Sequence, residues 1–266
     1  MSFDAGEAIE SGRSAASSLE PGGKSAQESG PMKICACHVP GTVVGKRPLK
    51  DPRLDAAHKL VAADKRTYAQ VDLSAEDGLA DADAIVTTAD SVLDLILQDL
   101  EFVETRLGNN PADAEKTVLR RMQADLEAGR CLSACAYPAA DWAAVNASGL
   151  VTRKPVAVAT ADETAHSDAL LVRAVAAAGW LSFLTVGGME NRAWLIRQGT
   201  TAWEAGGAIH TDIQKGFIRA EIIGWADFIA AGGETPAKRA GKLRLEMKEY
   251  VMQDYDLVNF RFNKTH

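Results

Sequence analysis

Gly45 and Lys46 follow a short apolar run and have the residue types that bind phosphate. A phosphate-binding loop needs glycines so that backbone N–H groups can wrap the phosphates, a lysine for their charge, and a Ser or Thr hydroxyl for magnesium. Here Pro40 takes the first glycine position and Arg47 takes the hydroxyl position. Proline has no backbone donor and arginine cannot ligate a cation. The sequence therefore predicts that Lys46 does not serve a working phosphate loop.

Three further residues have the chemistry of acid–base catalysts. Glu163 follows an apolar stretch at 154–160, where we expect it to lie in a loop or to cap a helix. His210 and Asp212 lie two residues apart at a boundary between helix and turn. Such a spacing favours hydrogen bonds to the local backbone over a catalytic pair. No catalytic residue is predicted.

Residues 181–266 supply the candidates for binding a ligand or partner. They are His210, Asp212, Lys215, Arg219, Lys238, Arg239, Lys242 and Arg244. The cations from Lys238 to Lys248 are consistent either with a local basic patch or with a solvated helix face carrying interspersed glutamates.

The four cysteines, Cys35, Cys37, Cys131 and Cys135, do not have the spacing of a recognisable zinc site, and no histidine pair lies near them. Cys35 and Cys37 should share one face of a strand, as buried thiols. No metal site is predicted.

Composition sets broad limits on the class of protein. The chain has 266 residues, 47% hydrophobic and 24% charged, and a net charge of −7. Residues 181–266 hold 11 Lys and Arg against 10 Asp and Glu, and the remainder holds 18 against 26. This balance argues against a broad nucleic-acid-coating surface and gives no DNA-binding signal. No apolar run approaches the ~20 residues that span a bilayer, and the N-terminus does not resemble a secretion signal, so we expect a cytoplasmic protein.

The N-terminal part should begin with a disordered tail at 1–31, because this segment is rich in Ser, Gly, Ala and Glu. Strands are then expected at 32–39, 67–73 and 84–88, with a helix from Pro52 through Asp64 that Asp51 caps. A leucine-rich stripe at 91–107 and a second apolar stripe at 119–126 predict an antiparallel helical hairpin within 91–136. The first stripe includes Leu93 and Leu97. A strand at 154–160 and a helix at 167–178 follow.

The C-terminal part, 181–266, should alternate strands and helices. Strands are expected at 190–197 and 217–223, helices at 200–210 and 225–232, and a closing hairpin between 249–252 and 257–262. This order makes a β-grasp domain plausible.

These residues carry a family resemblance. The sequences at 183–187, 190–194, 208–212, 215–221, 237–241 and 260–263 resemble the C-terminal TGS domain of YchF, an Obg-related P-loop NTPase family. Asp51 to Asp55 matches an Asp-Pro-Arg-Leu-Asp motif of that family, and the helical hairpin resembles its coiled-coil insertion. In two places the chain departs from the family pattern: Met247 and Tyr255 replace glycines.

The resemblance implies a degenerate nucleotide-binding domain at 32–180. The phosphate loop and its helix are absent, and Asp72 is followed by Leu73, Ser74 and Ala75 where the family has a switch glycine. Thr160 replaces the base-recognition asparagine, and a final strand is missing. The expected fold is α/β: an abbreviated P-loop-NTPase-like parallel sheet with the hairpin insertion, followed by an α+β β-grasp (TGS, ubiquitin-like) domain.

Three functional hypotheses follow from the resemblance. The first is a non-hydrolysing protein without a cofactor that binds the ribosome, RNA or a translation-related protein through the TGS domain. The second is a divergent enzyme that binds ATP or GTP through Gly41, Gly45 and Lys46, with Glu163 as a further candidate. The third is a structural regulator that pairs with a full-length YchF relative through residues 91–136.

Overall fold

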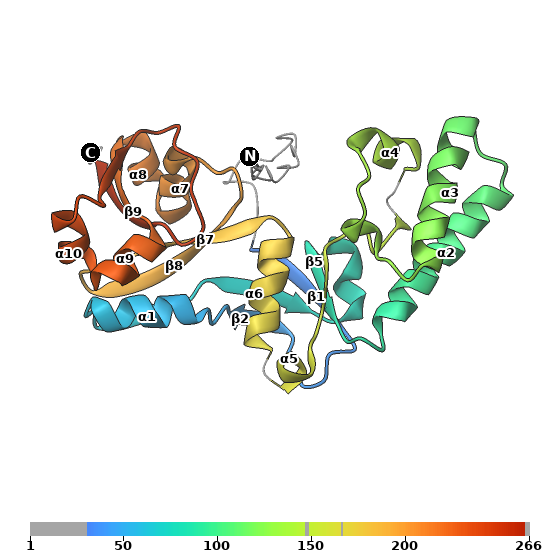
Figure 1. The fold of residues 1–266 in the computed structure, drawn as a ribbon, viewed down its shortest axis with the longest axis horizontal. Helices are drawn as coiled ribbons and strands as arrows, with labels where there is room; N and C mark the ends of the chain where they lie inside the picture. The colour runs from blue at the N-terminus through green and yellow to red at the C-terminus, as the bar shows by residue number, and fades with distance from the viewer. Residues whose placement is uncertain (1–30, 147–148, 166, 264–266) are drawn as a thin grey trace, which may run out of the picture.

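The structure is a computed structural model that describes residues 31–146, 149–165 and 167–263. The predicted tail lies outside these residues except at residue 31. Two β-sheets follow one another along an elongated molecule, and a helical hairpin projects from the end opposite the C-terminal sheet (Figure 1). In the part of the chain that the structure describes, no helix is both long and apolar enough to cross a membrane.

The first sheet has five strands, and four of them are parallel. Their order is β2 (Gly45–Pro48), β4 (Gln70–Ser74), β1 (Lys33–Cys37), β5 (Ala84–Thr87) and β6 (Val156–Val158). β1 and β5 are almost wholly buried because α6 (Asp168–Ala177) covers one face, while η1 (Glu76–Asp81) and the start of α2 (Val92–Gly108) cover the other. β2 pairs with β4 in the antiparallel direction.

The second sheet has six strands in mixed directions. Their order is β10 (Arg244–Glu246), β9 (Phe217–Ile223), β11 (Leu257–Phe262), β7 (Trp180–Thr185), β8 (Glu190–Arg197) and β3 (Lys65–Thr67). β11 is parallel to β7, and β3 is parallel to β8. β3 comes from the N-terminal part of the chain, so it ties that part to the C-terminal sheet.

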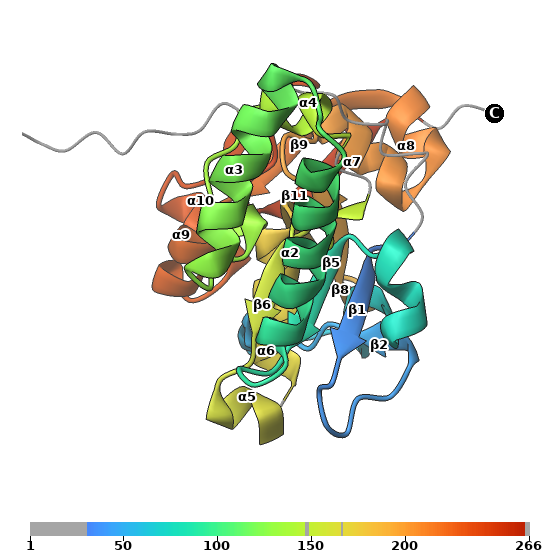
Figure 2. The same cartoon turned by 90° about the vertical axis from the view of Figure 1, so that its right-hand side faces the viewer.

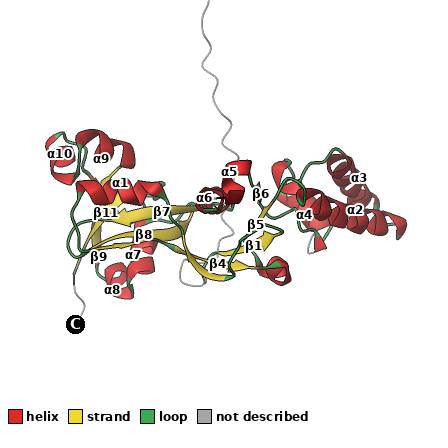
Figure 3. Ribbon diagram, turned by 90° about the horizontal axis from the view of Figure 1, so that it is seen from below, coloured by secondary structure: helices red, strands yellow, loops and turns green. Residues whose placement is uncertain are grey.

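Helices cover both faces of the second sheet (Figures 1 and 3). One face packs on α7 (Ala202–Ile209) and α8 (Thr211–Lys215), and the other faces α1 (Pro52–Leu60), α9 (Trp225–Ala231) and α10 (Glu234–Arg239). α7 begins with a capping box between Thr201 and Glu204. The turn after α8 requires a glycine, because a Cβ at Gly216 would lie 2.0 Å from the carbonyl oxygen of Asn263.

The hairpin consists of α2 (Val92–Gly108) and α3 (Asp113–Glu127), which lie side by side in antiparallel directions (Figures 1 and 2). Its core includes Ile96, Val103, Leu119 and Met122. The short helices η2 (Leu132–Ala134) and α4 (Ala139–Ala144) close one side of it, and α5 (Ala161–Ala165) follows β6. The hairpin forms its own hydrophobic cluster, whereas the two sheets share one core through α1, α6 and α9.

Four local expectations from the sequence are wrong. The predicted strand 67–73 is two strands, since the chain leaves the second sheet at Thr67 and enters the first at Gln70. The helix that begins at Pro52 ends at Leu60 rather than Asp64, because Val61 adopts an extended conformation. Within the leucine stripe of α2, Leu93 and Leu97 are exposed, while Leu95 and Asp99 are buried in the inward positions.

The fourth error is the closing hairpin between 249–252 and 257–262. β11 pairs with β9 and β7, and residue Val251 makes a single bridge to Thr201. The segment 248–252 satisfies the first free N–H groups of α7, since the amides of Ala202 and Trp203 donate to the carbonyls of Tyr250 and Lys248. The strand that pairs with the outer side of β9 is β10.

Candidate functional site

The carboxyl ends of β1 and β5 form the place where an open parallel sheet usually binds a ligand. β1 ends at Cys37, and the chain then runs through an irregular loop directly into β2, with no helix between the two strands. Lys46 lies opposite Asp72 in the β2–β4 ladder, exposed to solvent on the outermost strand. Lys46 and Gly45 therefore form part of a sheet edge.

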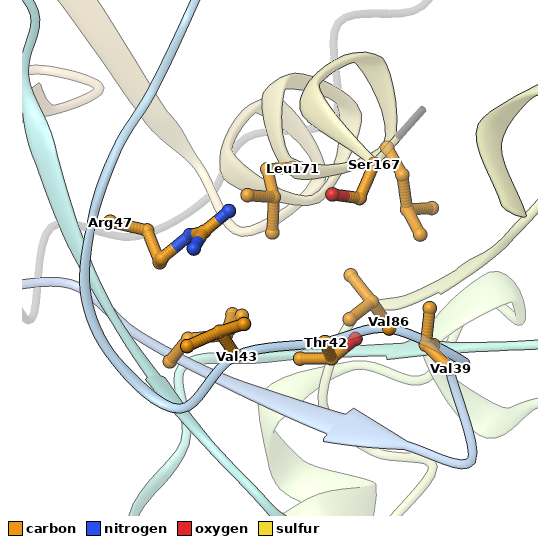
Figure 4. Close-up of a pocket in the computed structure, with 10 residues that line it drawn as sticks. Val39, Thr42, Val43, Arg47, Val86, Ser167 and Leu171 are labelled. Atoms are coloured by element: carbon orange, nitrogen blue, oxygen red, sulfur yellow. The ribbon is translucent and has the colours of Figure 1, made fainter. Parts of the chain in front are cut away.

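A small, shallow pocket lies beside this loop (Figure 4). Apolar side chains of the loop, β4, β5 and α6 form most of its wall, and the pocket is lined by Val39, Gly41, Thr42, Val43, Arg47, Leu73, Val86, Ser167, Leu170 and Leu171. Arg47 extends from β2 towards α6, and the hydroxyl of Ser167 points into the same space. Arg47 forms no ion pair with any side chain in the described ranges. Sequence reasoning missed this arrangement, since it depends on the loop folding back over α6.

The chemistry available in the pocket is limited. Its polar groups are one guanidinium and two hydroxyls, and none of its lining side chains is a carboxylate or an imidazole that could act as a base. Of the phosphate contacts considered from the sequence, Gly41 lines the pocket, whereas Gly45 and Lys46 do not.

Glu163 is buried and all its interactions are local. Its carboxylate accepts hydrogen bonds from the backbone amide and hydroxyl of Thr160, at 2.9 and 3.0 Å, and from Arg173 at 2.8 and 2.7 Å. The Arg173 guanidinium lowers the pKa of Glu163 from 4.5 to about 2. Glu163 therefore caps the first turn of α5 and, through Arg173, links α5 to α6.

We expect this pair to make folding stability depend on pH. Because the pKa of Glu163 is depressed in the folded chain, its contribution is present above the unfolded pKa near 4.5 and is lost as the pH falls towards about 2. The Glu163→Gln variant should have a free energy of unfolding about 1–2 kcal/mol lower at neutral pH, a figure already reduced because Arg173 is half exposed to solvent. In urea unfolding, its stability should also fall less steeply as the pH becomes acidic. The matched control is Asp162→Asn, which replaces an exposed neighbouring carboxylate; an equal effect in both variants would contradict the assignment.

His210 and Asp212 lie at the start of α8. The Nδ1 atom of His210 accepts a hydrogen bond of 3.1 Å from the backbone amide of Asp212, so His210 caps this helix. The Asp212 carboxylate lies 3.4 Å from the same nitrogen, and both side chains are exposed. No other described titratable side chain is bonded to either of them.

Most of the candidate cations are paired with carboxylates on the same surface. The pairs are Lys238 with Glu234 at 2.5 Å, Lys242 with Asp227 at 3.0 Å, Arg244 with Asp256 at 3.5 Å and Arg219 with Glu221 at 4.0 Å. Lys215 and Arg239 are exposed and form no ion pair within the described residues. These two are the cations of the set that an anionic partner could engage without first displacing a carboxylate.

A cluster that sequence reasoning did not foresee joins α1 to the second sheet. The guanidinium of Arg53 donates to Asp51 at 2.7 Å and to Asp254 at 2.5 Å, and its Cζ atom lies 3.5 Å from the ring centroid of Tyr255. Tyr255 is buried and has φ of 62°, in the left-handed region. Burial raises the pKa of Tyr255. The sequence signal was present, because Tyr255 replaces a glycine of the resembled family.

The cysteines form no disulfide in the structure. Cys35 and Cys37 are buried on the same face of β1, with their Sγ atoms 3.5 Å apart. Among the residues the structure describes, no three or more His, Cys, Asp or Glu side chains gather into a group that could hold a metal ion.

The two sheets and the helical hairpin allow the fold of this chain to be compared with solved structures. The chain is similar to the solved structure of the Schizosaccharomyces pombe YchF GTPase, with a TM-score of 0.63 over 90% of this chain and 100% of that chain, at 18% identity. Residues 180–263 match the family model YchF-GTPase_C, described as "Protein of unknown function (DUF933)". Residues 180–263 thus form a domain similar to the C-terminal domain of this family, and the chain as a whole is similar in fold to a YchF GTPase.

Curated relatives match about a third of this chain. The chain is 47% identical over 96 residues to the "Ribosome-binding ATPase YchF" of Bacillus subtilis, covering 36% of this chain and 26% of the relative. It is 54% identical over 82 residues to the protein of the same name from Haemophilus influenzae, covering 31% of this chain and 23% of the relative. The chain thus spans about a quarter of the length of the curated relatives it matches.

Proposed function

We propose that this chain binds the ribosome or its RNA through the C-terminal domain, acts in the cytoplasm, and does not hydrolyse nucleotides. The proposal rests on a difference between the C-terminal domain, which matches a known family model, and the first sheet, which lacks the features of a phosphate loop. Residues 180–263 match the family model YchF-GTPase_C. Over 96 and 82 residues, the chain is about half identical to two proteins named ribosome-binding ATPases. In the first sheet, by contrast, β1 leads straight into β2 without the helix and lysine of a phosphate loop.

The topology of the second sheet supports a β-grasp domain of the TGS type. The β7–β8 hairpin leads into α7, β9 and β10, and β11 then enters the centre of the sheet parallel to β7. α7 and α8 lie across one face over a core that includes Phe183, Ile222 and Phe260. A mixed sheet with this strand order and a short helix packed across one face supports the assignment to the β-grasp fold.

Ribosome binding can be tested by co-sedimentation of the full chain at low salt. Replacing Lys215 and Arg239 together by Glu should lower the bound fraction several-fold, because both cations are exposed and lack a carboxylate partner among the described residues. Lys59→Glu on α1 is the control, since Lys59 is also exposed but lies outside the C-terminal domain. Failure to co-sediment, or no loss on deleting residues 181–266, would refute the proposal.

Whether the chain binds ATP or GTP requires a separate experiment. Calorimetry with ATP or GTP and magnesium should detect no binding, and Lys46→Ala should change nothing, because Lys46 is an edge-strand side chain outside the pocket. Saturable binding that disappears in Lys46→Ala would instead support the divergent enzyme. RNase-insensitive co-purification of a full-length relative, dependent on residues 91–136, would support the structural regulator.

A further inference from the structure

The ends of the two sheets differ in how their outer edges are protected. At the ends of the first sheet, β2 contains Pro48, and the carbonyl of Val158 in β6 accepts a hydrogen bond of 2.7 Å from Arg173. At one end of the second sheet, β3 carries Lys65 and Arg66. Proline, covered carbonyls and cationic side chains all discourage a further strand from pairing with an edge.

β10, at the other end of the second sheet, is less protected, because it contains no proline and its one cation, Arg244, is accompanied by the carboxylate of Glu246. It pairs with β9 on one side, and no described strand lies on its other side. Its sequence is Arg244, Leu245 and Glu246, without a proline or bulge. Leu245 is 57% exposed, and Met247, just beyond the strand, is 62% exposed. An edge strand with exposed apolar side chains and free backbone groups is a template for pairing.

The order of residues in β10 is complementary to itself. In an antiparallel pair centred on Leu245, Arg244 of each copy lies opposite Glu246 of the other, and the two leucines face each other across the twofold axis. Opposite charges directly across a ladder are favourable, as is an apolar pair. Arg244 and Glu246 lie on one face of the strand, 3.7 Å apart, which is the face on which they would meet their counterparts. Arg244 also contacts Asp256 at 3.5 Å and donates to the Tyr250 hydroxyl at 3.0 Å, so it would share its charge between these groups and the second copy.

We propose that β10 pairs with β10 of a second copy of this chain, which joins the two C-terminal sheets through an isologous interface. Met247 adds apolar surface at each end of the paired strands, at a position where the resembled family has glycine. A three-residue strand buries less surface than the roughly 1,000 Å² of a stable interface. The association is therefore weak and reversible, and it is independent of the ribosome-binding proposal.

Sedimentation velocity of the full chain over a wide range of concentration tests this interface. The sedimentation coefficient should rise from a monomer to a dimer value with concentration. Leu245→Lys should raise the dissociation constant at least ~10-fold, because it places two ammonium groups at the axis. Leu93→Lys is the matched control, since Leu93 is an exposed leucine of similar accessibility, 54%, on α2. A chain that stays monomeric, or a dimer that survives Leu245→Lys, overturns the proposal.

Two further variants test the geometry of the interface. Glu246→Arg should also weaken the dimer, since it sets arginine against Arg244 of the second copy while removing only the intrachain contact with Arg244. Leu245→Cys should form a disulfide-linked dimer on mild oxidation, because the two cysteines would face each other within disulfide reach. Leu93→Cys should not do so. Equal cross-linking of both cysteine variants would show that association does not involve β10.

Discussion

The Tyr255→Gly variant should unfold about 3 kcal/mol more easily than the parent chain, although it restores the residue that the resembled family uses. Tyr255 has φ of 62°, where a non-glycine residue costs roughly 1–2 kcal/mol. Its ring is buried, packs edge-on against Trp225 at 5.8 Å and lies under Arg53 at 3.5 Å. Removing such a ring costs about 3–5 kcal/mol, and the lost cation–π contact adds about 1–2 kcal/mol. Relief of backbone strain offsets only part of this loss.

Urea unfolding would measure the change as a lower midpoint with an unchanged slope. Met247→Gly is the matched control, because it restores the other family glycine at a side chain that is 62% exposed. That control should shift the unfolding free energy by no more than about 0.5 kcal/mol. If Tyr255→Gly proved neutral or stabilising, backbone strain would outweigh the packing, and the Arg53 cluster would not hold α1 against the sheet.

In the C-terminal domain, the predicted strands and helices other than the closing hairpin were found from the sequence because their signals are local. The alternating charges Arg219 and Glu221 mark β9, and the threonine before Ala202 marks the start of α7. Each of these features depends on residues that are near one another in the chain. The strand at 190–197 and the helix that Gly232 ends were predictable for the same reason.

The errors arose where tertiary contacts override the local pattern. Thr67 and Gln70 belong to different sheets, which no periodicity within 67–73 can reveal. Leu93 and Leu97 fit a helical stripe, but the buried face of α2 is rotated so that Asp99 points inward. The same holds for the candidate site, where Arg47 and Ser167 line one pocket only because the loop after β1 approaches α6.

The contacts around Tyr255 help to hold the two sheets in one arrangement. Arg53 is bonded at once to Asp51 at the start of α1 and to Asp254 beside β11, with the tyrosine ring packed against it. Arg197 of β8 likewise pairs with Asp83, just before β5, at 2.8 Å. These contacts, with the shared core, fix the first sheet to the second. A fixed arrangement fits a binding protein that does not need a nucleotide to change its shape.

Asp99→Ala should lower the unfolding free energy by about 3–4 kcal/mol, although it removes only one carboxylate. Asp99 is fully buried and accepts hydrogen bonds from the amides of Val151 and Thr152, at 2.7 and 2.8 Å, and from the Thr152 hydroxyl at 2.5 Å. That hydroxyl also accepts a bond of 3.1 Å from the amide of Leu132. Burial raises the pKa of Asp99 even though these bonds favour its carboxylate. Alanine would leave three buried donors without an acceptor, at about 1–3 kcal/mol each before relaxation.

Thermal unfolding should show the loss as a fall in Tm of roughly 10 °C. Asp94→Ala, an exposed carboxylate on the same helix, is the control and should change Tm little. Hydrogen exchange separates a local from a global effect: the amides of Val151 and Thr152 should lose protection in Asp99→Ala by more than the amides of β7 do. A variant with unchanged Tm and exchange would mean that water replaces the carboxylate, and that Asp99 does not fasten the hairpin to the chain that returns into β6.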